Sequence, residues 1–133
     1  MGIPSKDHQI LQHIVRYCNQ VESTLSFFKA TKEDFQNSFL IQNAVSMPVQ
    51  QIGEFTKRFT DDFRNKNPDI PWKAIAGMRD YLSHEYLDMD IDIAWNTASK
   101  DIPRLRKYCI EILEQHNVPL PEIEKANIRG SET

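Results

Sequence analysis

The chain has 133 residues, a hydrophobic content of 40% and a formal net charge of −3. A chain of this length can bury roughly two thirds of its unfolded surface in a single core, which predicts one domain. The negative charge argues against a general duplex-DNA binder. The polar amino terminus lacks the apolar run of a signal peptide or membrane span, so we expect a soluble cytoplasmic protein.

Apolar residues recur at three- and four-residue steps and predict two helices in the first half of the chain. The first begins near the cap candidate Asp7 and extends to Phe28. The second opens at Thr31 and Asp34, which resemble a capping box, and continues to about Asn65 with a kink or break at Pro48. The expected inward positions of this second helix are Phe35, Phe39, Ala44, Met47, Ile52, Phe55, Phe59 and Phe63.

Two further helices are predicted in the second half. Residues 67–71 form a loop by composition, and Pro71 suits the first turn of a helix that carries Trp72, Ile75, Met78 and Leu82 inward. Another helix runs from about Ile91 to Leu113, with Pro103 as a candidate bend or point of division. Residues 117–133 are polar and contain proline, so we expect an extended, poorly ordered tail after a helical domain of residues 1–116.

The helices and the absence of any strand pattern predict an all-α fold, an up-and-down bundle of four to five helices in one domain. Trp72 and Trp95 fall on apolar stripes, which favours core packing over base stacking. Cys18 and Cys109 have no partners at a zinc-ligand spacing and are expected to pack as small hydrophobic residues.

The segment Gly77–Tyr86 concentrates the chemistry of the chain. Arg79 offers a permanent fork of donors suited to a phosphate, and His84, five residues later, can transfer a proton near neutral pH. Together they predict a pair that cleaves a phosphodiester. On an ideal helix a five-residue step rotates a side chain by about 140°, so Arg79 and His84 would not lie side by side. Three arrangements would still let both act on one substrate: the helix ends near His84, the substrate crosses two faces of the helix, or a second protomer completes the site.

The pattern R-x4-H-x-Y resembles the HepT-like family of the HEPN superfamily, and the likeness extends from Asp7 to about His116. It includes Gln51–Glu54, Ile70–Met78, the Trp95 segment and Asp101–Leu105. The resemblance implies a homodimer in which two motifs meet in one cleft. It also implies a minimal nucleotidyltransferase antitoxin that transfers AMP from ATP to the tyrosine at position 86.

The leading interpretation is an endoribonuclease toxin of a type II toxin-antitoxin system that needs neither metal nor cofactor. Two His84 side chains would act as base and acid, while two Arg79 guanidiniums would hold the phosphate of an RNA attacked by its own 2′-hydroxyl. The expected product is a 2′,3′-cyclic phosphate. The alternative is a noncatalytic subunit that binds a nucleotide or a nucleotidyltransferase partner.

We assign supporting roles to Asp80, Ser83 and Glu54. Asp80 lies four residues before His84 and could orient its imidazole or simply face solvent, and Glu54 could bond a neighbouring helix or the Arg79 region. Tyr86 could instead cap the helix end. Asp80 and His84 also have the spacing of two metal ligands, but no third ligand lies nearby, so no metal site is expected.

Between Lys57 and Arg79 six basic residues outnumber three acidic ones. This local excess either focuses a polyanion onto the face that carries the motif or is an ordinary solvated face. His8, His13 and His116 lack a comparable context and are expected to be structural or to face solvent.

Overall fold

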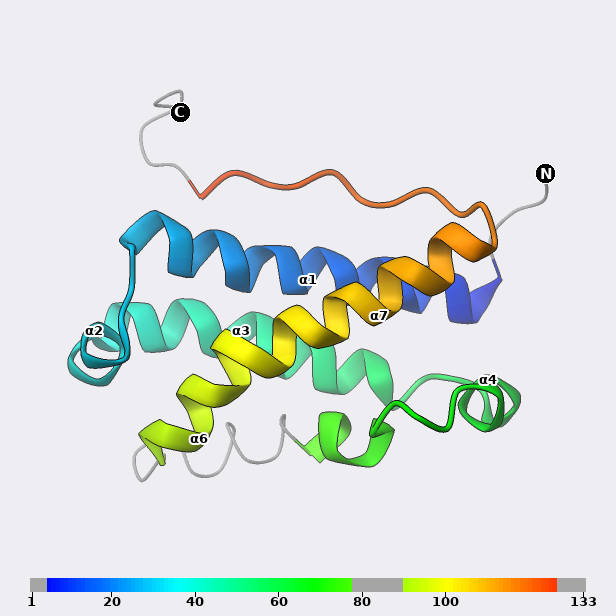
Figure 1. The fold of residues 1–133 in the computed structure, drawn as a ribbon, viewed down its shortest axis with the longest axis horizontal. Helices are drawn as coiled ribbons and strands as arrows, with labels where there is room; N and C mark the ends of the chain where they lie inside the picture. Colours follow the sequence, from blue (N-terminus) through cyan, green and yellow to red (C-terminus); the bar gives the residue numbers. More distant parts are fainter. Residues whose placement is uncertain (1–4, 78–89, 127–133) are drawn as a thin grey trace.

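The computed structural model describes residues 5–77 and 90–126, and all regular structure in these residues is helical. Three long helices form the body: α1 (Lys6–Phe28), α3 (Phe39–Thr56) and α7 (Ile102–Gln115). Figure 1 shows α1 antiparallel to α3, with α7 crossing α1, and α1 packs on both. One hydrophobic core joins these helices, so the prediction of a single all-α domain is confirmed. No helix among the described residues is long and apolar enough to cross a membrane.

The first helix has the predicted extent but a different cap. Its N-cap is Ser5, whose hydroxyl accepts a hydrogen bond from the His8 backbone N–H at 3.1 Å. Asp7, the predicted cap, lies inside the helix, and its carboxylate accepts two hydrogen bonds from Thr60. The helix ends where Lys29 adopts the left-handed conformation with φ of 48°.

The predicted second helix is wrong in its extent, because it is divided into α2 (Lys32–Asn37), α3 and α4 (Asp61–Lys66). The capping box of Thr31 and Asp34 is present as predicted. Ser38 is extended and accepts a hydrogen bond from the Ile41 backbone N–H at 3.3 Å, so it ends α2 and caps α3.

The break at Ser38 changes which residues of α3 face the core. Phe39 and Met47, expected inside, are 71% and 53% exposed, and Ala44 is exposed too. The buried hydrophobic residues of α3 are Ile41, Val45, Pro48, Val49 and Ile52. The predicted inward positions are therefore wrong between Phe39 and Met47, whereas Ile52, Phe59 and Phe63 are buried as expected.

Pro48 does not break the helix, because α3 continues through it. A proline in a helix removes the hydrogen bond to the carbonyl four residues earlier. That carbonyl belongs to Ala44 on the exposed side of α3, where water can bond it. The helix ends at Thr56 instead, and the Arg64 guanidinium donates to the carbonyls of Thr56 and Lys57 at 3.1 and 2.9 Å.

The final predicted helix is interrupted, as expected around Pro103. It consists of α6 (Ile91–Asn96), the π-helical turn η1 (Thr97–Asp101) and α7. Pro103 has no N–H to offer the Ser99 carbonyl, and the Ile102 N–H bonds the Thr97 carbonyl five residues back. The wider turn inserts an extra residue and rotates the face that α7 presents.

After α7 the described chain, to residue 126, is extended and lies along α1 (Figure 1). The Gln12 amide donates to the Pro119 carbonyl at 2.9 Å, and Arg16 Nε donates to Glu124 Oε1 at 2.7 Å. The expected extended conformation is therefore present in residues 118–126. The predicted flexibility of residues 117–133 remains a prediction.

Both cysteines are fully buried and free, as predicted for small hydrophobic residues. Burial raises the pKa of the Cys109 thiol to about 12 and that of Cys18 well above its usual value. Neither thiol is therefore a reactive group in the folded protein.

Candidate functional site

Five of the predicted site residues, Arg79, Asp80, Ser83, His84 and Tyr86, lie outside the described residues, as do Met78 and Leu82. The structure therefore describes the residues on either side of the motif segment. A helical segment, residues 72–77, precedes the motif, and α6 follows it.

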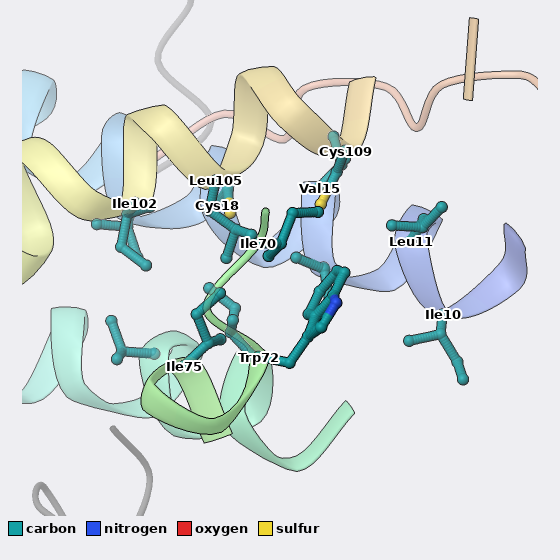
Figure 2. Close-up of a cluster of buried hydrophobic side chains, with 14 of the residues drawn as sticks. Ile10, Leu11, Val15, Cys18, Ile70, Trp72, Ile75, Ile102, Leu105 and Cys109 are labelled. Carbon is teal, nitrogen blue, oxygen red and sulfur yellow. The ribbon is translucent and has the colours of Figure 1, made fainter. Parts of the chain in front are cut away.

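The segment that leads into the motif is firmly anchored. The Trp72 indole N–H donates to the Asn67 carbonyl at 2.9 Å, and its ring centroid lies 4.8 Å from that of Phe59 and 5.5 Å from that of Phe63. Trp72 and Ile75 are 8% and 7% exposed. Figure 2 shows both side chains in the buried cluster, so their predicted inward positions are confirmed. Core packing thus fixes where the chain enters the motif.

The chain after the motif is anchored by a helix cap. The Asp90 carboxylate accepts hydrogen bonds from the backbone N–H groups of Asp92 and Ile93 at 2.9 and 3.3 Å. Asp92 forms an ion pair with Lys32 of α2. The Trp95 ring packs 5.8 Å from that of Phe35, again in the core rather than as a free stacking surface. Both ends of the motif segment are therefore held by the same folded body.

Glu54, the one predicted site residue that is described, lies on α3 and forms an ion pair with Lys57 at 3.9 Å. Its side chain is 37% exposed. The neighbouring Gly53 is buried, consistent with the close packing expected of a glycine inside a helix. Contact between Glu54 and Arg79 remains a prediction because Arg79 lies outside the described residues.

The basic stretch that precedes the motif is largely occupied by local contacts. Arg64 binds the end of α3 as described above, and Lys66 pairs with Asp62 at 3.1 Å. The Arg58 guanidinium lies 4.8 Å from the Phe55 ring centroid. These contacts favour the interpretation of an ordinary solvated face over that of a focused basic patch.

The histidines outside the motif are held by ring contacts. His8 lies 4.8 Å from His116, and His13 is stacked on Phe55 at 4.6 Å. Within residues 5–77 and 90–126, no three His, Cys, Asp or Glu side chains lie together in a way that could hold a metal ion. We expected these histidines to be structural or to face solvent, and the exposure of His13 and His116 agrees with that expectation.

The structure also reveals a pocket that the sequence did not indicate. It is a cavity of about 360 Å³ between residues 69–75, which lead to the motif, and the face of η1 and α7. Its lining consists of Asp69, Ile70, Pro71, Ala74, Ile75, Thr97, Asp101, Arg104, Leu105 and Tyr108. The only signal in the sequence was the stretch Asp101–Leu105, which carried part of the family resemblance.

Comparison with known proteins gives one family. The model of the family described as "Ribonuclease HepT-like" matches residues 14–112. That range includes the Arg79–Tyr86 pattern, both anchored flanks and the residues of the pocket. No solved structure matches the chain.

Three relatives illustrate the likeness. "Putative RNase TTE0752" of Caldanaerobacter subterraneus subsp. tengcongensis is 39% identical, with 79% of this chain and 92% of the relative aligned. "Putative RNase MJ1216" of Methanocaldococcus jannaschii is 35% identical over 84% of this chain and 92% of its own length. "Probable ribonuclease HepT" of Thermococcus cleftensis is 40% identical over 56% of this chain and 67% of its own length.

Proposed function

Because the chain belongs to the ribonuclease HepT-like family, we propose that it is a metal-independent endoribonuclease and the toxin of a type II toxin-antitoxin system. The observation that carries this proposal is the family match over residues 14–112, which contains Arg79 and His84 at the R-x4-H spacing. The family resemblance inferred from this spacing is confirmed, and so, at the level of the family, is the ribonuclease class of the enzyme.

The proposed chemistry follows from the two side chains. His84 removes the proton of the 2′-hydroxyl, and a second His84 protonates the leaving 5′ oxygen. Arg79 stabilises the negative charge that builds on the phosphate. The product carries a 2′,3′-cyclic phosphate, and DNA, which lacks the attacking hydroxyl, is not cut. Asp80 and Ser83 act as supporting residues that orient His84.

A homodimer would supply the second Arg79 and His84. The described surface offers an apolar face suited to such an association, since Phe39, Leu40 and Met47 of α3 are 71%, 61% and 53% exposed. Leu40 and Met47 are seven residues apart and therefore lie on one side of the helix. Burial of this face against a second copy would remove it from water. The up-and-down bundle of four to five helices is proposed as the unit that dimerises.

The proposed antitoxin is a minimal nucleotidyltransferase that transfers AMP from ATP to Tyr86. Tyr86 lies two residues after His84, so an added adenylate would bring bulk and negative charge close to the proposed catalytic histidine. Both effects would exclude an RNA phosphate. Modification at this residue would thus silence the enzyme without unfolding it.

Growth of a bacterial host tests the proposal directly. Expression of the chain alone should arrest growth, and expression of His84→Ala at the same level should not. His116→Ala provides a matched control, because His116 is an exposed histidine at the end of α7. Equal growth with the wild type and His84→Ala would favour the alternative, a noncatalytic binding subunit of a nucleotidyltransferase complex.

A further inference from the structure

The cavity beside residues 69–75 has both apolar and polar side chains in its lining. Ile70, Ile75 and Leu105, all nearly buried, form its floor, and the half-buried Tyr108 supplies an aromatic ring. Its volume of about 360 Å³ lies at the small end of the range for ligand pockets, roughly 300–1,000 Å³. The pocket is therefore large enough for one nucleoside and too small for several.

The π-helical turn aligns the polar groups of this pocket. Thr97, Asp101, Arg104 and Tyr108 follow one another at steps of three or four residues and line the same cavity. Pi-helical turns inside α-helices recur at functional sites, because the extra residue re-aims side chains. This one lies where Thr97 and Asp101 reach the pocket from η1, and Arg104 and Tyr108 reach it from α7.

The charged groups of the pocket are available to a ligand. Within residues 5–77 and 90–126, the side chains of Asp101, Arg104 and Tyr108 have no hydrogen-bond or ion-pair partner, although Asp101 and Arg104 are only three residues apart. An aspartate accepts two hydrogen bonds through its two oxygens, and an arginine donates two in parallel. The pocket thus presents one bidentate acceptor and one bidentate donor over an apolar floor.

Guanine is the nucleobase that complements this arrangement. Its N1–H and N2 amino groups form a pair of adjacent donors that a carboxylate can accept, and its O6 and N7 form the acceptor pair that arginine binds. The faces of an unpaired base also stack on aromatic and apolar side chains. Adenine, cytosine and uracil each lack at least one of these two paired edges.

The pocket is close to the proposed site of cleavage along the chain. Arg79 follows Ile75, which lines the pocket, by four positions, and four residue steps span at most about 14 Å in any conformation. A base held in the pocket and a phosphate held by Arg79 can therefore belong to the same short stretch of RNA.

We propose that this cavity is a base subsite that holds an unpaired guanine of the RNA substrate, with Asp101 on its donor edge, Arg104 on its acceptor edge and Tyr108 against its face. The proposal rests on the proposed ribonuclease function, because it assigns a substrate preference to that enzyme. It makes Asp101 a specificity-determining residue rather than a catalytic one.

Binding to uncleavable RNA tests the subsite independently of catalysis. Single-stranded oligonucleotides with 2′-fluoro sugars lack the attacking hydroxyl, and replacing guanine by inosine deletes only the N2 amino group. By fluorescence anisotropy, the wild type should bind the guanine oligonucleotide about tenfold more tightly than the inosine one. Asp101→Asn should reduce this ratio to near one. Glu111→Gln removes the same charge from an exposed position of α7 outside the pocket and should leave the ratio unchanged.

A second variant fills the pocket without touching the core. Ala74 is exposed and lines the cavity, so Ala74→Phe should weaken binding of the guanine oligonucleotide about tenfold while the protein keeps its thermal stability. Equal binding of guanine and inosine oligonucleotides by the wild type would overturn the proposal. So would an unchanged ratio in Asp101→Asn, or binding of free guanosine monophosphate as tight as that of the oligonucleotide, which would identify a mononucleotide site.

Cleavage of a long unstructured RNA separates the two proposals. The mapped ends should share a guanine at one fixed position relative to the cut, and Asp101→Asn should relax that preference about tenfold while it still cuts. Cleavage without any preferred base would overturn the guanine subsite and leave the ribonuclease function standing. Selective guanine binding without cleavage would retain the subsite and overturn the ribonuclease function.

Discussion

Asp7 accepts two hydrogen bonds from Thr60, one from its backbone N–H at 2.9 Å and one from its hydroxyl at 2.7 Å. The same hydroxyl accepts the Phe63 N–H at 3.1 Å and so caps α4. The first turn of α1 is therefore joined to the start of α4, whose Phe63 packs against Trp72. This contact helps to set the position from which the chain enters the motif.

Thr60→Ala removes the cap of α4 and the hydrogen bond from the Thr60 hydroxyl to Asp7 but keeps the one from the backbone N–H, so it should lower the free energy of unfolding by about 1–2 kcal/mol. Urea denaturation followed by circular dichroism measures the change. In a double-mutant cycle with Asp7→Ala, the two losses should be less than additive by at least about 0.5 kcal/mol. Strict additivity would show that the hydrogen bond between the Thr60 hydroxyl and Asp7 does not contribute to stability in solution.

Much of the fold follows from the sequence, because periodicity and capping are local properties. The apolar stripe from Ile10 to Phe28 predicts a helix of the correct extent, and the capping box at Thr31 predicts the correct start of α2. The break at Ser38 was missed because serine occurs inside helices as well as at their N-caps. Its hydroxyl caps α3 in the folded chain, where Ile41 and Val45 are buried in the core. At Pro48 the sequence predicts a kink or break, but α3 continues through it. The loss of a single hydrogen bond is tolerated where the freed carbonyl can bond water.

Acidification should destabilise the protein through His8. Burial lowers the pKa of His8, and the charge of His116 lowers it further, against a smaller opposing effect of Asp7. A histidine whose pKa falls on folding binds fewer protons in the folded state, so stability decreases as the pH falls below about 6.5, its ordinary value. His8→Gln should flatten the decrease in free energy of unfolding between pH 6.5 and 5, and His116→Gln should do so in part. An unchanged slope in His8→Gln would remove this histidine as the cause.

The exposed face of α3 should be the surface on which two copies associate. Leu40→Glu combined with Met47→Glu places two charges on that face and alters no buried residue, so the protein should fold and become monomeric. Light scattering at micromolar concentration gives the mass. Lys107→Glu and Glu111→Lys together exchange charges at exposed positions of α7 and serve as the control, which should remain dimeric. A wild type that is monomeric and fully active would eliminate the composite site.

Tyr86 should be the residue at which the enzyme is silenced. Incubation with ATP, magnesium and the cognate nucleotidyltransferase should add one or more AMP masses to the protein and abolish its toxicity. Tyr86→Phe keeps the ring and deletes the nucleophilic oxygen, so intact mass spectrometry should find no adduct. Tyr17→Phe is the control that should still be modified. An adduct on Tyr86→Phe, located by peptide mapping on another residue, would refute the assignment.

The candidate site was less accessible to prediction than the fold. The R-x4-H spacing predicts Arg79 and His84 because the chemistry of each side chain is evident from its type, and both stay predictions because they lie outside the described residues. The pocket was missed, since its lining comes from two stretches, residues 69–75 and 97–108, that only tertiary packing brings together. The inserted π-helical residue that aligns Thr97, Asp101 and Arg104 also has no simple periodic signal.

Cleavage of single-stranded RNA by purified protein in EDTA is the most direct test of the central claim that Arg79 and His84 cut RNA without a metal. We expect products with a 2′,3′-cyclic phosphate, a rate roughly 10²–10⁴-fold lower for His84→Ala, and a wild-type rate for His116→Ala. Cleavage by folded His84→Ala at the wild-type rate, or cleavage by the wild type that stops in EDTA, would contradict it.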